Sequence, residues 1–199
     1  MNMSGEYLLQ PLTLKDRVSV ILYRTGILLS ALVMLCTSIF MLSYEPESWG
    51  SGISGIFLLL LYLFTGLSVL NIHLYMGSLR RFLRGMYLFS LGLLLILFFL
   101  GRGNPALPLL KIPLSALLLL PLAAAIAFIG AKEAYCFNLI EGYILGLLLP
   151  LYILLWSMTS NDMKVYGLIA CSVLMLFLGL RKAVMPLSFD IGDKSKYIP

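Results

Sequence analysis

Six long apolar runs, separated by short polar connections, dominate this chain of 199 residues. Each run is close to the ~20 residues that an α-helix needs to cross a hydrocarbon layer about 30 Å thick. The runs are Thr25–Ser43, Ile53–Met76, Phe82–Leu100, Pro113–Lys132, Gly142–Thr159 and Met163–Leu180. The sequence therefore predicts an all-α fold, a polytopic transmembrane bundle of six helices.

The composition supports a membrane environment and one domain. Hydrophobic residues make up 61% of the chain and charged residues 12%, whereas soluble domains carry roughly 25% charged residues. No polar stretch is long enough to fold separately. We therefore expect a transmembrane domain at 25–180, preceded by a cytoplasmic or interfacial segment at 1–24 and followed by a cytoplasmic tail at 181–199.

The basic residues are divided unequally between the two sides that this topology defines. Eleven of the 14 lysines and arginines fall on the side of the termini, and only Arg102, Lys111 and Lys164 fall on the opposite side. Loops rich in lysine and arginine stay in the cytoplasm. The bias predicts that both termini are cytoplasmic, or stromal in a plastid, and an even number of spans requires them to share a side.

The first helix is expected to begin before the first apolar run. Thr13 and Asp16 have the spacing of a capping box, with Asp in place of the usual Glu or Gln. A helix from Leu14 would place its first turns in the headgroup layer. We expect Arg24 to extend its charge into that layer as part of an ordinary membrane anchor.

Small residues recur every four positions in three of the runs. Because close backbone approach drives helix association in lipid, these stripes predict helix contacts. Contact within this chain is the commoner outcome, although contact with another protein stays open. The stripes are Ala123, Ala127 and Ala131; Gly142 and Gly146; and Gly26 with Ser30.

The most unusual polar connection is Gly130–Tyr143, which holds Lys132, Glu133, Asn138 and Glu141. If this stretch is helical, both carboxylates share one face. We expect them to form ion pairs with arginines on the same side of the membrane. Partner recognition and the handling of protons or cations are the alternatives. The candidate arginines are Arg80, Arg81 and Arg84.

His73 is the only histidine, near the cytoplasmic end of the second run. Without a second ligand at a suitable spacing, it gives poor evidence for a metal or haem. We expect it to form an interfacial or interhelical hydrogen bond. The sequence also has no phosphate-binding loop or catalytic motif. We therefore expect no catalysis, cofactor, metal or nucleic-acid partner.

Two short motifs, GAKEAYCFNLIEGY at 130–143 and the closing FDIGDKSKYIP, resemble an uncharacterised family of small integral membrane proteins. The family is known mainly from cyanobacteria and chloroplast-bearing plants, as a domain of unknown function. The resemblance depends on Lys132, Glu133, Phe137, Glu141 and Gly192–Tyr197. It implies a bacterial inner membrane or a thylakoid membrane, and it implies no catalytic residues.

The last residues of the chain alternate apolar with charged side chains. Apolar residues at Phe189, Ile191, Tyr197 and Ile198 predict that the tail docks under the bundle, near the segment Glu133–Glu141, or onto a partner. The preferred function is that of a non-catalytic accessory or assembly partner in a larger membrane complex, in contact with lipid and with other integral membrane proteins. The alternative is a small transporter or channel that uses Glu133, Glu141 and His73.

Overall fold

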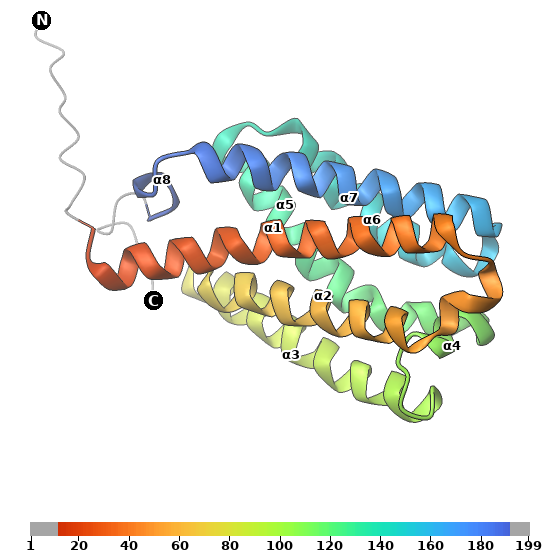
Figure 1. The fold of residues 1–199 in the computed structure, drawn as a ribbon. Helices are drawn as coiled ribbons and strands as arrows, with labels where there is room; N and C mark the ends of the chain where they lie inside the picture. The colour runs from red at the N-terminus through yellow and green to blue at the C-terminus, as the bar shows by residue number, and fades with distance from the viewer. Residues whose placement is uncertain (1–11, 192–199) are drawn as a thin grey trace, which may run out of the picture.

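The structure is a computed structural model that describes residues 12–191, and these residues form helices and connecting turns without a β-strand. Six segments are long and apolar enough to cross a membrane, so the predicted fold class is confirmed (Figure 1). The long helices are α1 (Leu14–Ser43), α2 (Gly52–Asn71), α3 (Gly77–Leu100), α5 (Leu120–Phe137), α6 (Ile140–Leu155) and α7 (Asn161–Val184). The short ones are η1 (Pro46–Gly50), α4 (Leu107–Lys111), η2 (Pro113–Leu119), η3 (Trp156–Met158) and α8 (Ser188–Ile191).

Helix α1 begins where the capping box predicts. The Thr13 hydroxyl accepts a hydrogen bond from the Asp16 backbone at 3.2 Å, and the Asp16 carboxylate accepts one from the Thr13 backbone at 3.0 Å. The helix has 30 residues, which corresponds to a length of about 45 Å. The expected boundary between residues 24 and 25 therefore lies inside one continuous helix.

The stripes of small residues are helix contacts within the chain. A Cβ atom added to Gly142 would lie 2.3 Å from the carbonyl oxygen of Gly130, so the α5 and α6 backbones touch. A Cβ atom on Gly26 would lie 2.7 Å from the Phe64 carbonyl oxygen, so α1 and α2 are equally close. The predicted packing surfaces are confirmed.

The fourth span is broken near its start. Its first part, η2, is a seven-residue 3₁₀-helix, although 3₁₀ runs longer than 3–4 residues are uncommon. Pro121 then lies in the first turn of α5, where the missing N–H removes no helical hydrogen bond. The backbone immediately before this proline is therefore wound more tightly than an α-helix.

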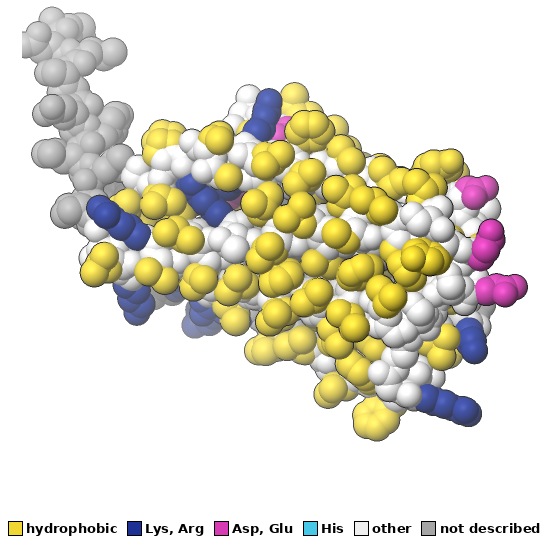
Figure 2. Space-filling view, viewed as in Figure 1, with side chains coloured by type: hydrophobic (Ala, Val, Ile, Leu, Met, Phe, Trp, Pro, Cys, Tyr) yellow, Lys and Arg dark blue, Asp and Glu magenta, His cyan; other side chains and the backbone are white. Residues whose placement is uncertain are grey.

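The two ends of the bundle differ in charge. We call the end where α1 begins and α7 ends the charged end, and the end formed by η1 and η3 the aromatic end. Lysines and arginines gather at the charged end, whereas the acidic side chains visible in Figure 2 lie mainly at the aromatic end. The described basic residues of the charged end are Lys15, Arg17, Arg24, Arg80, Arg81, Arg84, Lys132, Arg181 and Lys182.

Candidate functional site

Five charged side chains meet inside the charged end. They come from α1, from α5, and from α7 with the adjacent α8, three regions that are far apart in the sequence but lie together at this end of the bundle (Figure 1). We call this group the charge cluster, and it contains three cations and two carboxylates. Its members are Arg24, Lys132, Glu133, Lys182 and Asp190.

Glu133 is one centre of the charge cluster, and its side chain is completely buried. Its Oε1 atom lies 2.6 Å from the Lys132 ammonium, and its Oε2 atom lies 2.7 Å from the Lys182 ammonium. The Tyr23 hydroxyl, also buried, donates a hydrogen bond to Oε1. Both carboxylate oxygens are therefore held by cations.

Asp190 is the second centre, and it fixes α8 to the bundle. Its Oδ1 atom lies 2.7 Å from the Lys182 ammonium, so Lys182 bridges the two carboxylates. Its Oδ2 atom accepts hydrogen bonds from Nε and Nη2 of Arg24. Arg24 also donates to the carbonyl oxygens of Met185 and Pro186, in the segment between α7 and α8.

Aromatic rings complete the enclosure. The Lys182 ammonium lies 3.4 Å from the centroid of the Phe137 ring, and the Lys132 ammonium lies 4.9 Å from that of Tyr23. A cation over an aromatic face is attracted by the negative face of the ring. These rings therefore stabilise the lysines where water is excluded.

This arrangement acts chemically as a clamp. A charge that leaves water is strongly unfavourable unless it is paired and hydrogen-bonded. Each carboxylate here meets at least two cations, and these cations come from different helices. The cluster therefore requires α1, α5, α7 and α8 to occupy one relative arrangement.

The structure corrects the expectation for Arg24. The sequence predicted that this side chain reaches the headgroup layer, but it is 8% exposed and lies inside the bundle. The reason is the tail, which folds back and brings Asp190 against α1. A counter-charge within the protein removes the need to reach water.

The predicted arrangement of the two glutamates is also wrong. Asn138 has a φ of 54° and ends α5, so Glu133 and Glu141 lie on separate helices. Glu141 is 3.2 Å from Arg181 on α7. Ion pairing of both glutamates is confirmed. The predicted partners were Arg80, Arg81 and Arg84, but the observed partners come from α5 and α7, which pack beside these glutamates.

The arginines at the start of α3 and Asn138 lie outside the charge cluster. Arg84 donates to the Leu70 carbonyl oxygen at 2.7 Å, and so closes the connection between α2 and α3. Arg81 and Asn138 are exposed, and Arg80 is partly buried. Of the predicted site residues, the structure places only Lys132 and Glu133 in the cluster.

His73 lies in the connection between α2 and α3, and its Nε2 atom is 3.0 Å from the Ser19 hydroxyl of α1. The predicted hydrogen bond between separate elements is confirmed. Burial lowers the pKa of His73 below its ordinary value of 6.5, and the nearby charge of Lys132 lowers that pKa further.

Sequence reasoning missed Tyr23, Lys182 and Asp190 as site residues. Lys182 follows Arg181 at the end of a span, where a basic pair is the ordinary signal of a cytoplasmic boundary. The apolar pattern of the tail was the available signal. The predicted docking is confirmed for Ile191, which is buried beside Asp190, and it is wrong for Phe189, which is 53% exposed. Tyr197 and Ile198 lie outside the described residues.

Comparison with known proteins gives the family. A family model described as "Uncharacterized integral membrane protein (DUF2301)" matches residues 67–198. The chain belongs to the DUF2301 family. A Haemophilus influenzae protein described as "Uncharacterized protein" is 32% identical to this chain, over 98% of this chain and 99% of its own length. No solved structure matches the chain.

These matches correct the expected distribution of the family. A Haemophilus influenzae protein is similar to this chain over nearly its whole length, so relatives of the chain are not restricted to cyanobacteria and plastids. The findings support an integral membrane protein, and they give no support to a thylakoid location. The matched region contains four members of the charge cluster, namely Lys132, Glu133, Lys182 and Asp190.

Proposed function

We propose that this protein is a non-catalytic accessory or assembly partner of a larger membrane complex, in a bacterial inner membrane, with its charged end in the cytoplasm. The excess of lysine and arginine at that end supports the orientation. The single observation that carries the proposal is the charge cluster, because it uses its ionisable groups to hold α8 and three long helices together.

A cluster that holds several chain segments in one arrangement can maintain a surface on which a partner docks. Buried ion pairs add little net stability, and their best-attested use is to specify one arrangement of the elements that they join. The clamp fixes the surface formed by α8 and the helix ends. Exposed bases surround it and offer complementary charge to an acidic partner surface. These are Lys15, Arg17, Arg81 and Arg181.

The contacts of Glu133, Glu141 and His73 favour the accessory role over a carrier. A carrier would use these groups along one path. In the structure they have separate partners, Lys132 and Lys182 for Glu133, Arg181 for Glu141 and Ser19 for His73. If the protein were a carrier, Glu133→Gln or Glu141→Gln would abolish its flux in proteoliposomes. Our proposal expects that the wild-type protein itself gives no flux.

Native gel electrophoresis of membranes from the source cell, in mild detergent, tests the proposal. We expect the wild-type protein to migrate in a larger assembly, and the double variant Arg17→Gln with Arg81→Gln to leave it. The matched control neutralises Arg102 and Lys111, two exposed bases of the aromatic end, and should stay in the assembly. Migration at monomer size, or an equal effect of both double variants, would contradict the proposal.

A further inference from the structure

We propose that the aromatic end contains a binding site for a neutral molecule dissolved in the membrane, a single ring that carries one hydroxyl or carbonyl oxygen. The site is a cavity of about 130 Å³ between α1, α2, η2, α5 and α6. An engineered apolar cavity of about 150 Å³ binds benzene. This cavity therefore has the size for one six-membered ring.

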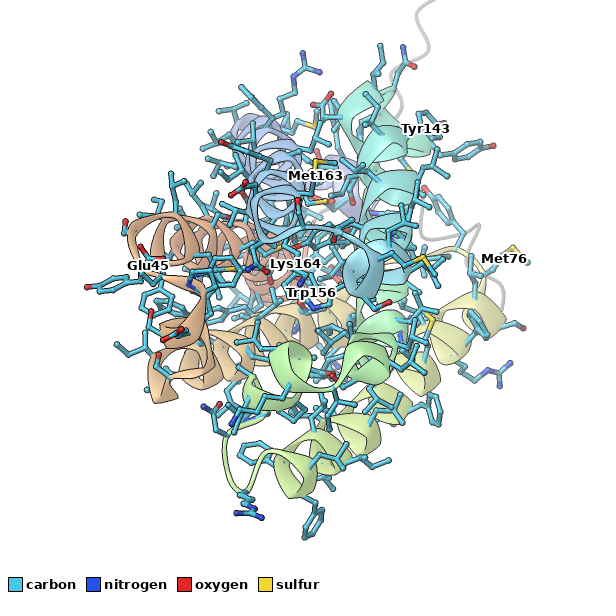
Figure 3. The ribbon with its side chains drawn as sticks, turned by 90° about the vertical axis from the view of Figure 1, so that its right-hand side faces the viewer. Glu45, Met76, Tyr143, Trp156, Met163 and Lys164 are labelled. Carbon is cyan, nitrogen blue, oxygen red and sulfur yellow. The ribbon has the colours of Figure 1, made fainter. Side chains whose placement is uncertain are left out.

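Two tryptophans line the cavity, and they are the only two in the chain. The indole nitrogen of Trp49 donates to the Tyr44 carbonyl oxygen, and that of Trp156 donates to the Leu109 carbonyl oxygen, each at 2.8 Å. Figure 3 looks onto this end and shows Trp156 near the middle of the ring of helices, with Lys164 beside it. Because both N–H groups are bonded elsewhere, the tryptophans offer the cavity an apolar ring surface.

The wall of the cavity is irregular at one side. Ala116 and Leu119 of the 3₁₀-helix η2 line it, together with Ala123 of the first turns of α5. Non-helical backbone at membrane depth is tolerated where it is buried in protein or lines a cavity. The break in the fourth span is thus part of what makes room inside the bundle.

Ser54 decides the chemistry of the ligand. Its side chain lines the cavity, the residue is only 9% exposed, and its hydroxyl has no hydrogen-bond partner among residues 12–191. A buried hydroxyl without a partner is unfavourable. The Thr37 hydroxyl at the same cavity already donates to the Val33 carbonyl oxygen at 2.8 Å.

Two other occupants fit this arrangement less well. A buried water needs two to four polar partners. The Ser54 hydroxyl is free, whereas the hydroxyls of Thr37 and Tyr152, which also line the cavity, already donate to backbone carbonyl oxygens. The end of a lipid chain is a methyl group, which would leave Ser54 unpaired. A ring with one oxygen fills the apolar space and also satisfies the hydroxyl.

Quenching of tryptophan fluorescence tests the site, because both tryptophans line it. The probes are 4-bromophenol and bromobenzene, which share a ring and a bromine quencher and differ in the hydroxyl. The purified full chain is titrated in lipid nanodiscs at neutral pH. We expect saturable quenching by 4-bromophenol, with bromobenzene weaker by about two- to tenfold, the range that one net hydrogen bond gives.

Two variants sharpen this test. Ala123→Leu fills the cavity and should abolish the saturable quenching, whereas Ala170→Leu, on the exposed surface of α7, should leave it unchanged. Ser54→Ala should lower the affinity for 4-bromophenol to that for bromobenzene. Thermal unfolding followed by circular dichroism checks that each variant folds, and Ala116→Leu replaces Ala123→Leu if the latter does not.

Two results would overturn the proposal. Quenching that rises linearly and equally in the wild type and the filled variant would mean that the probes only dissolve in the bilayer. Equal affinity of wild type and Ser54→Ala for 4-bromophenol would mean that the cavity does not recognise an oxygen. In the second case a lipid chain would become the better occupant.

Discussion

The charged end and the aromatic end of the bundle are closed by different chemistry. At the charged end, ion pairs join four helices and the backbones of Gly130 and Gly142 touch. At the aromatic end, tryptophans and aliphatic side chains surround a cavity of about 130 Å³. In lipid, apolar side chains gain little by leaving the solvent. Directional polar pairs therefore fix one arrangement of the helices at the charged end, whereas apolar contacts at the aromatic end leave space for a cavity between them.

Glu133→Gln should give the largest effect on this comparison. It leaves Lys132 and Lys182 buried without one of their two carboxylates. Removal of one partner of a buried ion pair reduces the free energy of unfolding by about 3–5 kcal/mol. The measurement is unfolding by sodium dodecyl sulfate in mixed micelles, followed by circular dichroism.

A variant that removes a cation of the cluster, in place of a carboxylate, distinguishes the loss of a carboxylate from a general loss of packing. Lys182→Met should reduce the free energy of unfolding less, because Glu133 keeps Lys132 and Asp190 keeps Arg24. If the two variants lose equal free energy of unfolding, the carboxylates contribute no more than the lysines to the stability of the cluster.

Added methyl groups should show the second largest effect, and the effect should be larger at the charged end than at the aromatic end. In Gly142→Ala the new Cβ atom would lie 2.3 Å from the Gly130 carbonyl oxygen, which belongs to the backbone. Overpacking of this kind costs about 1–3 kcal/mol. In Gly167→Ala it would lie 2.6 Å from the Tyr152 ring. That ring borders the cavity, which leaves space beside it, so the loss should be smaller.

The same unfolding measurement checks this pair. An equal loss in both alanine variants would show that the aromatic end is packed as rigidly as the charged end. That result would also weaken the case for a site that admits a ligand.

The sequence could predict the features that local patterns determine. The spans follow from hydrophobicity, the start of α1 from the spacing of Thr13 and Asp16, and the close contacts from the glycines at 26 and 142. Each of these signals acts within one helix or one helix pair. These signals can therefore be recognised in the sequence without knowledge of the other elements.

The charge cluster could not be predicted, because the pairs that join α1, α5 and the end of the chain are distant in the sequence. Arg24 and Asp190 are 166 positions apart, and each residue separately fits an interfacial position. The cavity could not be predicted either, since it depends on how the broken fourth span packs against its neighbours. Asn138 shows the same limit at short range, because its left-handed backbone separates two glutamates that a continuous helix would align.

Two buried serines provide a smaller test of the same contrast. The Ser68 hydroxyl donates to the Tyr23 carbonyl oxygen at 3.0 Å, near the charge cluster, so Ser68→Ala should cost about 1 kcal/mol. The Ser54 hydroxyl has no partner among the described residues, so Ser54→Ala should be nearly neutral in the absence of ligand. A loss at Ser54 equal to that at Ser68 would mean that Ser54 has a partner.

The smallest predicted effect is a dependence of stability on pH at the charged end. The pKa of His73 in the folded protein lies below the ordinary value of 6.5, first because of burial and then because of Lys132. Arg80 lowers the pKa further, whereas Asp190 and Asp16 raise it. Since the unfolded chain binds the proton more tightly, the contribution of His73 to stability is complete above pH 6.5 and is lost as the pH falls through the folded pKa.

The variant His73→Gln isolates this effect, because glutamine does not titrate and can still bond to Ser19. Between about pH 7.5 and pH 5.5, a window around the ordinary histidine pKa, the wild type should lose more thermal stability than the variant. The aromatic end contains no histidine, so the difference arises where Lys132 and His73 lie together. Equal losses in both proteins would mean that His73 keeps its ordinary pKa, and that the cations of the charged end do not act on it.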